Sequence, residues 1–99
     1  MEVILNDRGF VIIIDDDASS VSVLQELLIN DGYDVEWKAS GREALEFIAV
    51  NEPNLVMLSD HLSDTTPFKL LDRLKEIKQA RDIPVILMTT DDDAEARLK

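Results

Sequence analysis

The chain has 99 residues, 45% hydrophobic and 31% charged, which is enough for one globular domain with a small core. Its 21 acidic and 10 basic side chains give a net charge of −11, which disfavours binding to nucleic acid or anionic membranes. The sequence lacks cysteine and has one histidine, which excludes disulfides, thiol catalysis and zinc sites rich in cysteine or histidine. It has no signal-like or membrane-spanning apolar segment, so we expect a cytoplasmic protein.

The first predicted element is a strand over Phe10–Ile14, where five β-favouring apolar residues in a row indicate burial on both faces. Ser19 and Ser20 are candidate N-caps of the helix that follows. Apolar residues then recur at helical spacing, at Val21, Leu24, Leu27 and Leu28. Asp31 and Gly32 are expected to end this helix.

The alternating pattern of Tyr33–Lys38 predicts a second strand, half exposed and at an edge of the sheet. Ser40 and Glu43 fit a capping box for a second helix. One side of that helix is predicted to carry Leu45, Ile48 and Ala49. The proline-containing segment 51–54 then breaks the chain.

A third, buried strand is predicted over Leu55–Leu58, ending in Ser59 and Asp60. Pro67 suits the first turn of a third helix. The apolar positions of that helix are Leu70, Leu71, Leu74 and Ile77. A fourth strand is expected over Val85–Met88, and residues 91–99 begin as an acid-rich helical turn.

The order of these elements is β-α-β-α-β-α-β-α, which predicts an α/β fold, a doubly wound parallel sheet with helices on both faces. Ligands of such sheets bind beyond the carboxyl ends of the strands. The first strand ends in Asp15 and Asp16, the third in Asp60 and the fourth in Thr89. We therefore expect the chemistry of this chain along one edge of the sheet.

Three consecutive carboxylates, Asp15, Asp16 and Asp17, follow the first strand. Two such charges about 4 Å apart repel by roughly 4 kcal/mol at an effective dielectric constant of about 20. A hard divalent cation such as Mg²⁺ would relieve this repulsion. A buried strand followed by a solvated helix cap explains the same residues, and the pattern alone leaves both interpretations open.

Together these motifs resemble a response-regulator receiver domain of two-component signalling, from about Phe10 to about Asp92. The resemblance rests on the segments VIIIDDDASS, LVMLSD and PVILMTT. Asp16 and Asp60 are 44 positions apart, and Asp60 and Thr89 are 29 apart, which is similar to the family's spacing. The resemblance implies a flavodoxin-like receiver fold.

The resemblance also implies a site and a function. Asp60 would accept a phosphoryl group from a sensor histidine kinase or a phosphotransfer protein. Thr89, followed by Thr90, would bind the phosphoryl group and switch the conformation. The implied Mg²⁺ ligands are Asp15, Asp16, Asp60 and the backbone carbonyl of Leu62. The chain would then be a signalling domain rather than an enzyme with a separate substrate, Asp17 would cap a helix, and His61 would be exposed.

The sequence departs from the family pattern in two places. Asp64 stands where the family usually has a proline, and Pro67 stands where it usually has a glycine, so the 61–68 loop has an unusual sequence. The family's fifth strand, led by a lysine, and its fifth helix have no counterpart here. We therefore expect residues 1–99 to be a C-terminally incomplete receiver domain, with four of five βα units, that self-associates through its fourth strand.

Two alternatives remain. A pseudo-receiver would bind partners without being phosphorylated, which the missing lysine and the unusual loop favour. A phosphohydrolase of the haloacid dehalogenase type would use the Asp-x-Asp pattern of Asp15 and Asp17, although this leaves Asp60 unexplained. A phosphohydrolase would be modified on Asp15, and a receiver domain on Asp60.

Overall fold

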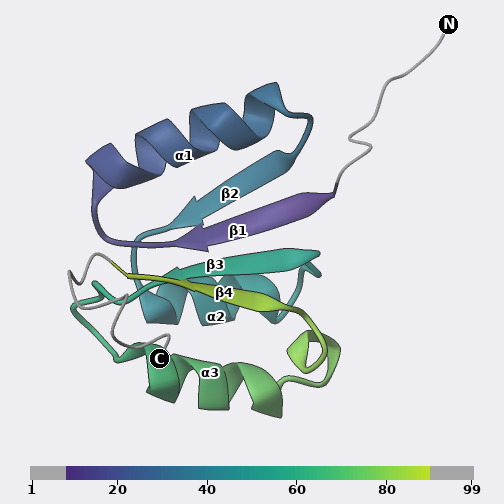
Figure 1. Cartoon of the computed structure of the whole chain (residues 1–99). Coiled ribbons are helices and arrows are strands. Elements are labelled where there is room, and N and C mark those ends of the chain that lie inside the picture. Colours follow the sequence, from purple (N-terminus) through teal and green to yellow (C-terminus); the bar gives the residue numbers. More distant parts are fainter. Residues whose placement is uncertain (1–8, 90–99) are drawn as a thin grey trace, which may run out of the picture.

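The computed structural model describes residues 9–89, which form a four-stranded parallel sheet. The strands are β1 (Phe10–Ile14), β2 (Asp34–Lys38), β3 (Leu55–Ser59) and β4 (Val85–Met88). Their order across the sheet is β2-β1-β3-β4, so β2 is an edge strand, as its alternating sequence predicts (Figure 1). All four carboxyl ends meet at one edge of the sheet.

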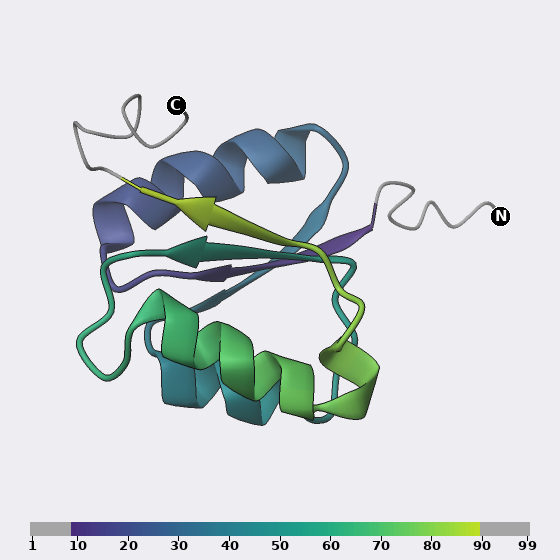
Figure 2. The same ribbon diagram turned by 60° about the horizontal axis from the view of Figure 1, so that its bottom comes forward.

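Helices cover both faces of this sheet, which confirms the predicted doubly wound α/β fold. They are α1 (Ala18–Asn30), α2 (Gly41–Ile48), α3 (Pro67–Glu76) and the short 3-10 helix η1 (Lys78–Ala80). Helix α1 lies on one face, and α2 and α3 lie on the other (Figure 2). The fourth helix predicted for residues 91–99 falls outside the described residues. Among residues 9–89, no helix is long and apolar enough to cross a membrane.

The core is organised around β1, whose side chains alternate between the two faces. Ile12 and Ile14 pack with α2 and α3, whereas Val11 and Ile13 pack with α1. All four are at most 1% exposed. Burying a side chain of this size contributes about 1.5–3 kcal/mol. The continuous apolar run predicted to be buried on both faces is therefore confirmed, and it holds the carboxyl end of β1 in a fixed place.

The N-cap of helix α1 lies two or three residues before Ser19 and Ser20, so their assignment as N-caps is wrong. The N-cap is Asp17, whose carboxylate accepts hydrogen bonds from the Ser19 N–H and the Ser20 hydroxyl, both at 3.0 Å. Asp17 is a stronger cap than serine here because its negative charge is also stabilised by the positive end of the helix dipole. The helix ends as predicted at Asp31, and Gly32 has the positive φ of 97° that closes a Schellman motif.

Helix α2 has the predicted cap. The Ser40 hydroxyl oxygen accepts a hydrogen bond from the Glu43 N–H at 3.2 Å and donates one to the Glu43 carboxylate at 3.0 Å. Its buried side differs from the prediction, because Ala44 and Ile48 are buried whereas Ala49 is the exposed C-cap residue.

Strand β4 is less well covered than the others. Within residues 9–89 it pairs only with β3, and its Ile86 and Leu87 are 47% and 38% exposed. On helix α1, the side chains of Val23 and Leu27 are each 63% exposed. Leu27 is therefore exposed although it shares the helical spacing of Val21, which is buried.

Candidate functional site

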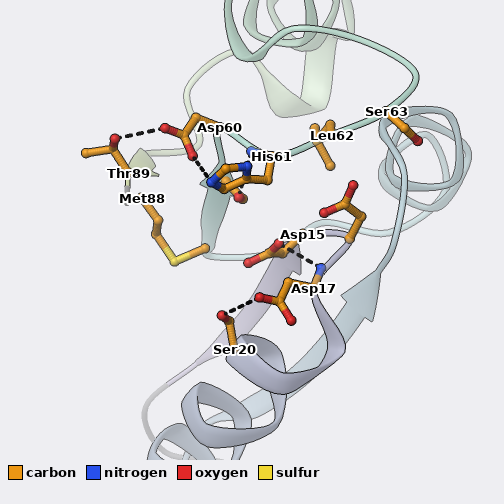
Figure 3. A pocket seen from close by; sticks show the side chains of 11 residues that line it. Asp15, Asp17, Ser20, Asp60, His61, Leu62, Ser63, Met88 and Thr89 are labelled. Carbon is orange, nitrogen blue, oxygen red and sulfur yellow. Dashed lines mark hydrogen bonds and ion pairs between the residues drawn. The ribbon is translucent and has the colours of Figure 1, made fainter. Parts of the chain in front are cut away.

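An open pocket of about 630 Å³ lies at the carboxyl ends of β1, β3 and β4. Its lining residues are Asp15, Asp16, Asp17, Ser20, Ser59, Asp60, His61, Leu62, Ser63, Met88 and Thr89. Figure 3 shows Asp60, His61 and Thr89 on one side of the pocket, across from Asp15 and Asp17. The three strand ends that the sequence singled out therefore meet in one place. Thr90 lies outside the described residues.

Asp60 is held at the end of β3 by both its backbone and its side chain. Its N–H donates to the Met88 carbonyl at 3.1 Å, which extends the pairing of β3 with β4. Its Oδ2 accepts a hydrogen bond from the Thr89 hydroxyl at 2.8 Å. Its Oδ1 is buried, accepts no hydrogen bond from the described residues and lies 3.5 Å from His61 Nε2. The carboxylate is therefore oriented, with one oxygen left to interact inside the pocket.

Asp15 lies at the end of β1 and is only 7% exposed. Its N–H donates to the Lys38 carbonyl at 3.1 Å, and its Oδ1 accepts from the Asp17 N–H at 3.0 Å. Its backbone carbonyl accepts a hydrogen bond from Trp37 Nε1 at 2.6 Å. Asp16 is exposed at the pocket. The β1 end thus presents one fixed and one solvated carboxylate.

Asp17 also lines the pocket, but its side chain forms its hydrogen bonds with α1. The Ser20 hydroxyl, and then the backbone N–H of Ser19, lower the pKa of Asp17 below the usual carboxyl range. Both bonds stabilise its charged form as the helix cap. The predicted capping role of Asp17 is therefore confirmed.

The pocket fits a divalent cation that keeps part of its water shell. Oδ1 of Asp60 is buried and has no hydrogen bond to the described part of the chain, and a cation would satisfy such an oxygen. No lysine or arginine of the described segment lines the pocket to neutralise its carboxylates. The described acidic and histidine side chains do not form a ready cage of three or more ligands. Mg²⁺ is commonly bound by one or two carboxylates plus water, which matches this arrangement.

The loop between β3 and α3 is fixed at several points. The His61 N–H donates to the Ser59 hydroxyl oxygen at 2.9 Å, and the Leu62 side chain packs against the core beneath α2 and α3. Asp64 accepts hydrogen bonds from the backbone N–H groups of Gly41 and Arg42, each at 3.0 Å. These two bonds, Gly41 first, lower the pKa of Asp64. The unusual loop is therefore tied to the N-terminus of α2.

Two residues near the site were not recognised from the sequence. Trp37 lies on β2, and its indole N–H donates a hydrogen bond to the Asp15 carbonyl. Asp64 was noted only as a departure from the family pattern. Neither contact has a sequence signal, because the partners lie 22 or 23 positions away along the chain. The exposure predicted for His61 is confirmed, although its ring lies beside Asp60.

Comparison with known proteins decides the family. The profile of the response regulator receiver domain matches residues 11–99. The chain belongs to the response regulator receiver domain family. This receiver domain shares the motifs from which the resemblance was drawn, and its relatives are regulators of two-component systems.

The receiver domain is 32% identical over 82 residues to the two-component response regulator ORR3 of Oryza sativa subsp. indica. The match covers 82% of this chain and 63% of the rice protein, so the chain spans less than two thirds of that relative. Among solved structures, it is similar to the signal receiver domain of a histidine kinase from Syntrophus aciditrophicus. That match has a TM-score of 0.79 and 29% identity, and covers 91% of this chain and 68% of the other.

A second similar structure is the receiver domain of a sensor histidine kinase from Pseudomonas aeruginosa, with a magnesium ion coordinated in its active site cleft. The TM-score is 0.79 at 18% identity, covering 88% of this chain and 74% of the other. At this identity the likeness establishes the fold. The predicted flavodoxin-like receiver fold is confirmed by these comparisons together.

Proposed function

We propose that this receiver domain accepts a phosphoryl group on Asp60 and signals by changing the conformation around Thr89. The observation that carries this proposal is the state of the Asp60 carboxylate. One oxygen is held by the Thr89 hydroxyl at 2.8 Å, and the other is buried at the pocket and accepts no hydrogen bond from residues 9–89. A carboxylate that is oriented but not fully hydrogen-bonded is suited to act as a nucleophile.

The donor would be a phosphohistidine of a sensor histidine kinase or a phosphotransfer protein. An Asp60 oxygen attacks phosphorus, a P–O bond forms and the P–N bond to the imidazole breaks. The imidazole leaves with the electron pair of that bond and takes up a proton. The product on this chain is an acyl phosphate at Asp60, and no oxidant or reductant is needed.

Asp15, Asp16, Asp60 and the backbone carbonyl of Leu62 would hold Mg²⁺ beside Asp60. When bound, the ion would neutralise charge on the transferring phosphoryl oxygens. The exposed position of Asp16 suits a ligand that binds through or beside water, and the hydrogen bond from the Asp17 N–H orients Asp15. The magnesium ion in the active site cleft of the similar Pseudomonas aeruginosa domain supports a magnesium site in this pocket.

Thr89 would couple phosphorylation to a change in shape. Its hydroxyl now donates to Asp60 Oδ2, an oxygen whose charge and surroundings change on phosphorylation. The hydroxyl would then donate to a phosphoryl oxygen instead. Since Thr89 directly follows β4, its movement would be passed to the end of that strand.

Labelling with acetyl phosphate tests the proposal. Asp60 should become an acyl phosphate only when Mg²⁺ is present, as located by mass spectrometry. Asp60→Asn should abolish labelling because an amide is not a nucleophile here, whereas Asp17→Asn, which changes only a helix cap, should label nearly as well as the wild type. Phosphate found on Asp15 would favour the phosphohydrolase alternative, and on His61 would overturn the assignment of Asp60.

A pseudo-receiver is the second candidate, and it has one observation in its favour. No lysine or arginine among residues 9–89 lines the pocket to pair with a phosphoryl group. If the folded wild type is not labelled on Asp60 by acetyl phosphate or by a kinase, the chain acts as an interaction module without phosphorylation.

We further propose that the 99-residue form associates with itself. Within the described residues, β4 has one partner strand, and the exposed Ile86, Leu87, Val23 and Leu27 add apolar surface. The net charge of −11 opposes association at low salt, so association should strengthen as ionic strength rises. Light scattering across protein and salt concentrations measures this. A monomer at high concentration and high salt would contradict it.

A further inference from the structure

We infer that Asp64 is a positioning residue, which fixes the backbone carbonyl of Leu62 for the cation by tying the β3–α3 loop to helix α2. The inference rests on the proposed function, since it concerns the same cation site. It assigns a role to a residue that departs from the family's usual proline at this position.

The tie has two bonds of good geometry. The two oxygens of the Asp64 carboxylate accept separately from the N–H groups of Gly41 and Arg42, each at 3.0 Å. Both donors belong to the first turn of α2, where backbone N–H groups lack partners within the helix. The charge of the carboxylate suits this end of the helix dipole. Asp64 therefore caps a helix that is not its own.

The packing around these bonds is tight. A Cβ atom added at Gly41 would lie 2.6 Å from Thr65 Cγ2 and 3.4 Å from Asp64 Oδ1. The loop therefore lies directly against the backbone of α2, and glycine provides the space for it. Two residues further on, Thr66 caps α3 through a hydrogen bond from the Lys69 N–H at 3.2 Å.

Hydrogen bonds fix the loop on both sides of Leu62. On one side, the His61 N–H is bonded to Ser59, and on the other, Asp64 is bonded to α2. The Leu62 side chain packs against the core, and Leu62 also lines the pocket with Asp15, Asp16 and Asp60. Removing the Asp64 carboxylate would break both hydrogen bonds between the loop and α2, and the Leu62 carbonyl would be held less firmly.

The test measures Mg²⁺ binding, using the fluorescence of Trp37, whose indole contacts the Asp15 carbonyl. In Asp64→Ala we expect the Mg²⁺ concentration for half-saturation to rise about tenfold, the low end for residues that orient metal ligands. Asp64→Asn keeps one acceptor oxygen and should show an intermediate shift. The rate of Asp60 labelling should fall at limiting Mg²⁺ and return to the wild-type value at saturating Mg²⁺.

Two controls separate positioning from general stability. Ser40→Ala removes the cap of the same helix without touching the loop, and Asp72→Ala removes an exposed negative charge on α3. Neither should shift Mg²⁺ half-saturation. Hydrogen exchange of the amides at 61–63 should accelerate in Asp64→Ala but not in Ser40→Ala, with or without Mg²⁺.

The outcomes distinguish this inference from the proposed function. Equal Mg²⁺ curves for wild type and Asp64→Ala, or equal shifts for Asp64→Ala and Ser40→Ala, would overturn the positioning role. If the wild type neither binds Mg²⁺ nor becomes labelled while loop exchange still depends on Asp64, the tie is correct but the proposed function and the positioning role for the cation are wrong.

Discussion

The β1–α1 junction and the β3–α3 loop both end at the pocket, and each contains an aspartate that accepts hydrogen bonds at a helix N-terminus. Asp17 bonds to residues two and three positions later, at the start of its own helix. Asp64 bonds to residues 22 and 23 positions earlier, at the start of another helix. The first arrangement shapes one helix, whereas the second holds a loop and a helix together. Similar chemistry therefore serves local structure in one place and tertiary structure in the other.

The largest expected effect on stability comes from a steric clash between α2 and the β3–α3 loop, at the place where Asp64 joins them. Gly41→Ala places a methyl group 2.6 Å from Thr65 Cγ2, and we expect it to cost about 1–3 kcal/mol of the free energy of unfolding, typical of overpacking. Urea unfolding followed by Trp37 fluorescence measures the loss.

Thr65→Ser supplies the control, because it removes the clashing Cγ2 and keeps the hydroxyl. The double variant Gly41→Ala, Thr65→Ser should recover most of the lost stability. A single Gly41→Ala variant as stable as the wild type would mean that the loop moves easily, which would contradict a firm tie.

A smaller effect is expected from removing the local cap. Asp17→Ala should lower the urea midpoint, because α1 loses its side-chain cap, while leaving Mg²⁺ half-saturation unchanged. Asp64→Ala should change both quantities. Circular dichroism during unfolding and the Trp37 titration provide the two measurements. Equal shifts of Mg²⁺ half-saturation in both variants would contradict the view that Asp17 acts only on its own helix whereas Asp64 also holds the loop.

The smallest effect concerns pH. The pKa values of Asp17 and Asp64 are both lowered in the folded state, by hydrogen bonds to Ser20 and Ser19 in one case and to Gly41 and Arg42 in the other. The folded state therefore binds fewer protons, and its extra stability is fully present above the ordinary carboxyl pKa of about 3.9. This stability is lost as pH falls through the lowered pKa values.

Asp17→Asn and Asp64→Asn should each make stability depend less on pH in the acid range. Urea midpoints between pH 7 and pH 3 should fall less steeply in either variant than in the wild type, by a modest amount because both carboxylates are solvated. A slope equal to that of the wild type in both variants would place the acid sensitivity in other carboxylates.

The sequence predicts most of the scaffold because its signals are local. The apolar run at Phe10–Ile14, the capping box at Ser40 and the proline at Pro67 each act within a few residues, and each element forms where expected. The error at Ser19 and Ser20 arises because several residues near one helix start can serve as caps. The nearest carboxylate, Asp17, takes that position.

The candidate site could be predicted only in part. The sequence identifies Asp15, Asp16, Asp60 and Thr89, because strand ends of a parallel sheet meet at one edge. Their roles in phosphorylation and Mg²⁺ binding stay predictions, as does the role of Leu62. The departure of the 61–68 loop from the family pattern was visible, but its consequence was not, since a sequence does not show which helix an aspartate will reach.

The sequence by itself thus determined the alternation of strands and helices, the acidic character of the chain and the strand ends that carry the candidate chemistry. These follow from side-chain pattern and backbone preference, which act over one or two turns. Only the tertiary structure decided that Trp37 contacts the Asp15 carbonyl, that one oxygen of Asp60 accepts no hydrogen bond from the described residues, and that Asp64 caps α2. Each of these depends on packing between elements far apart in the chain.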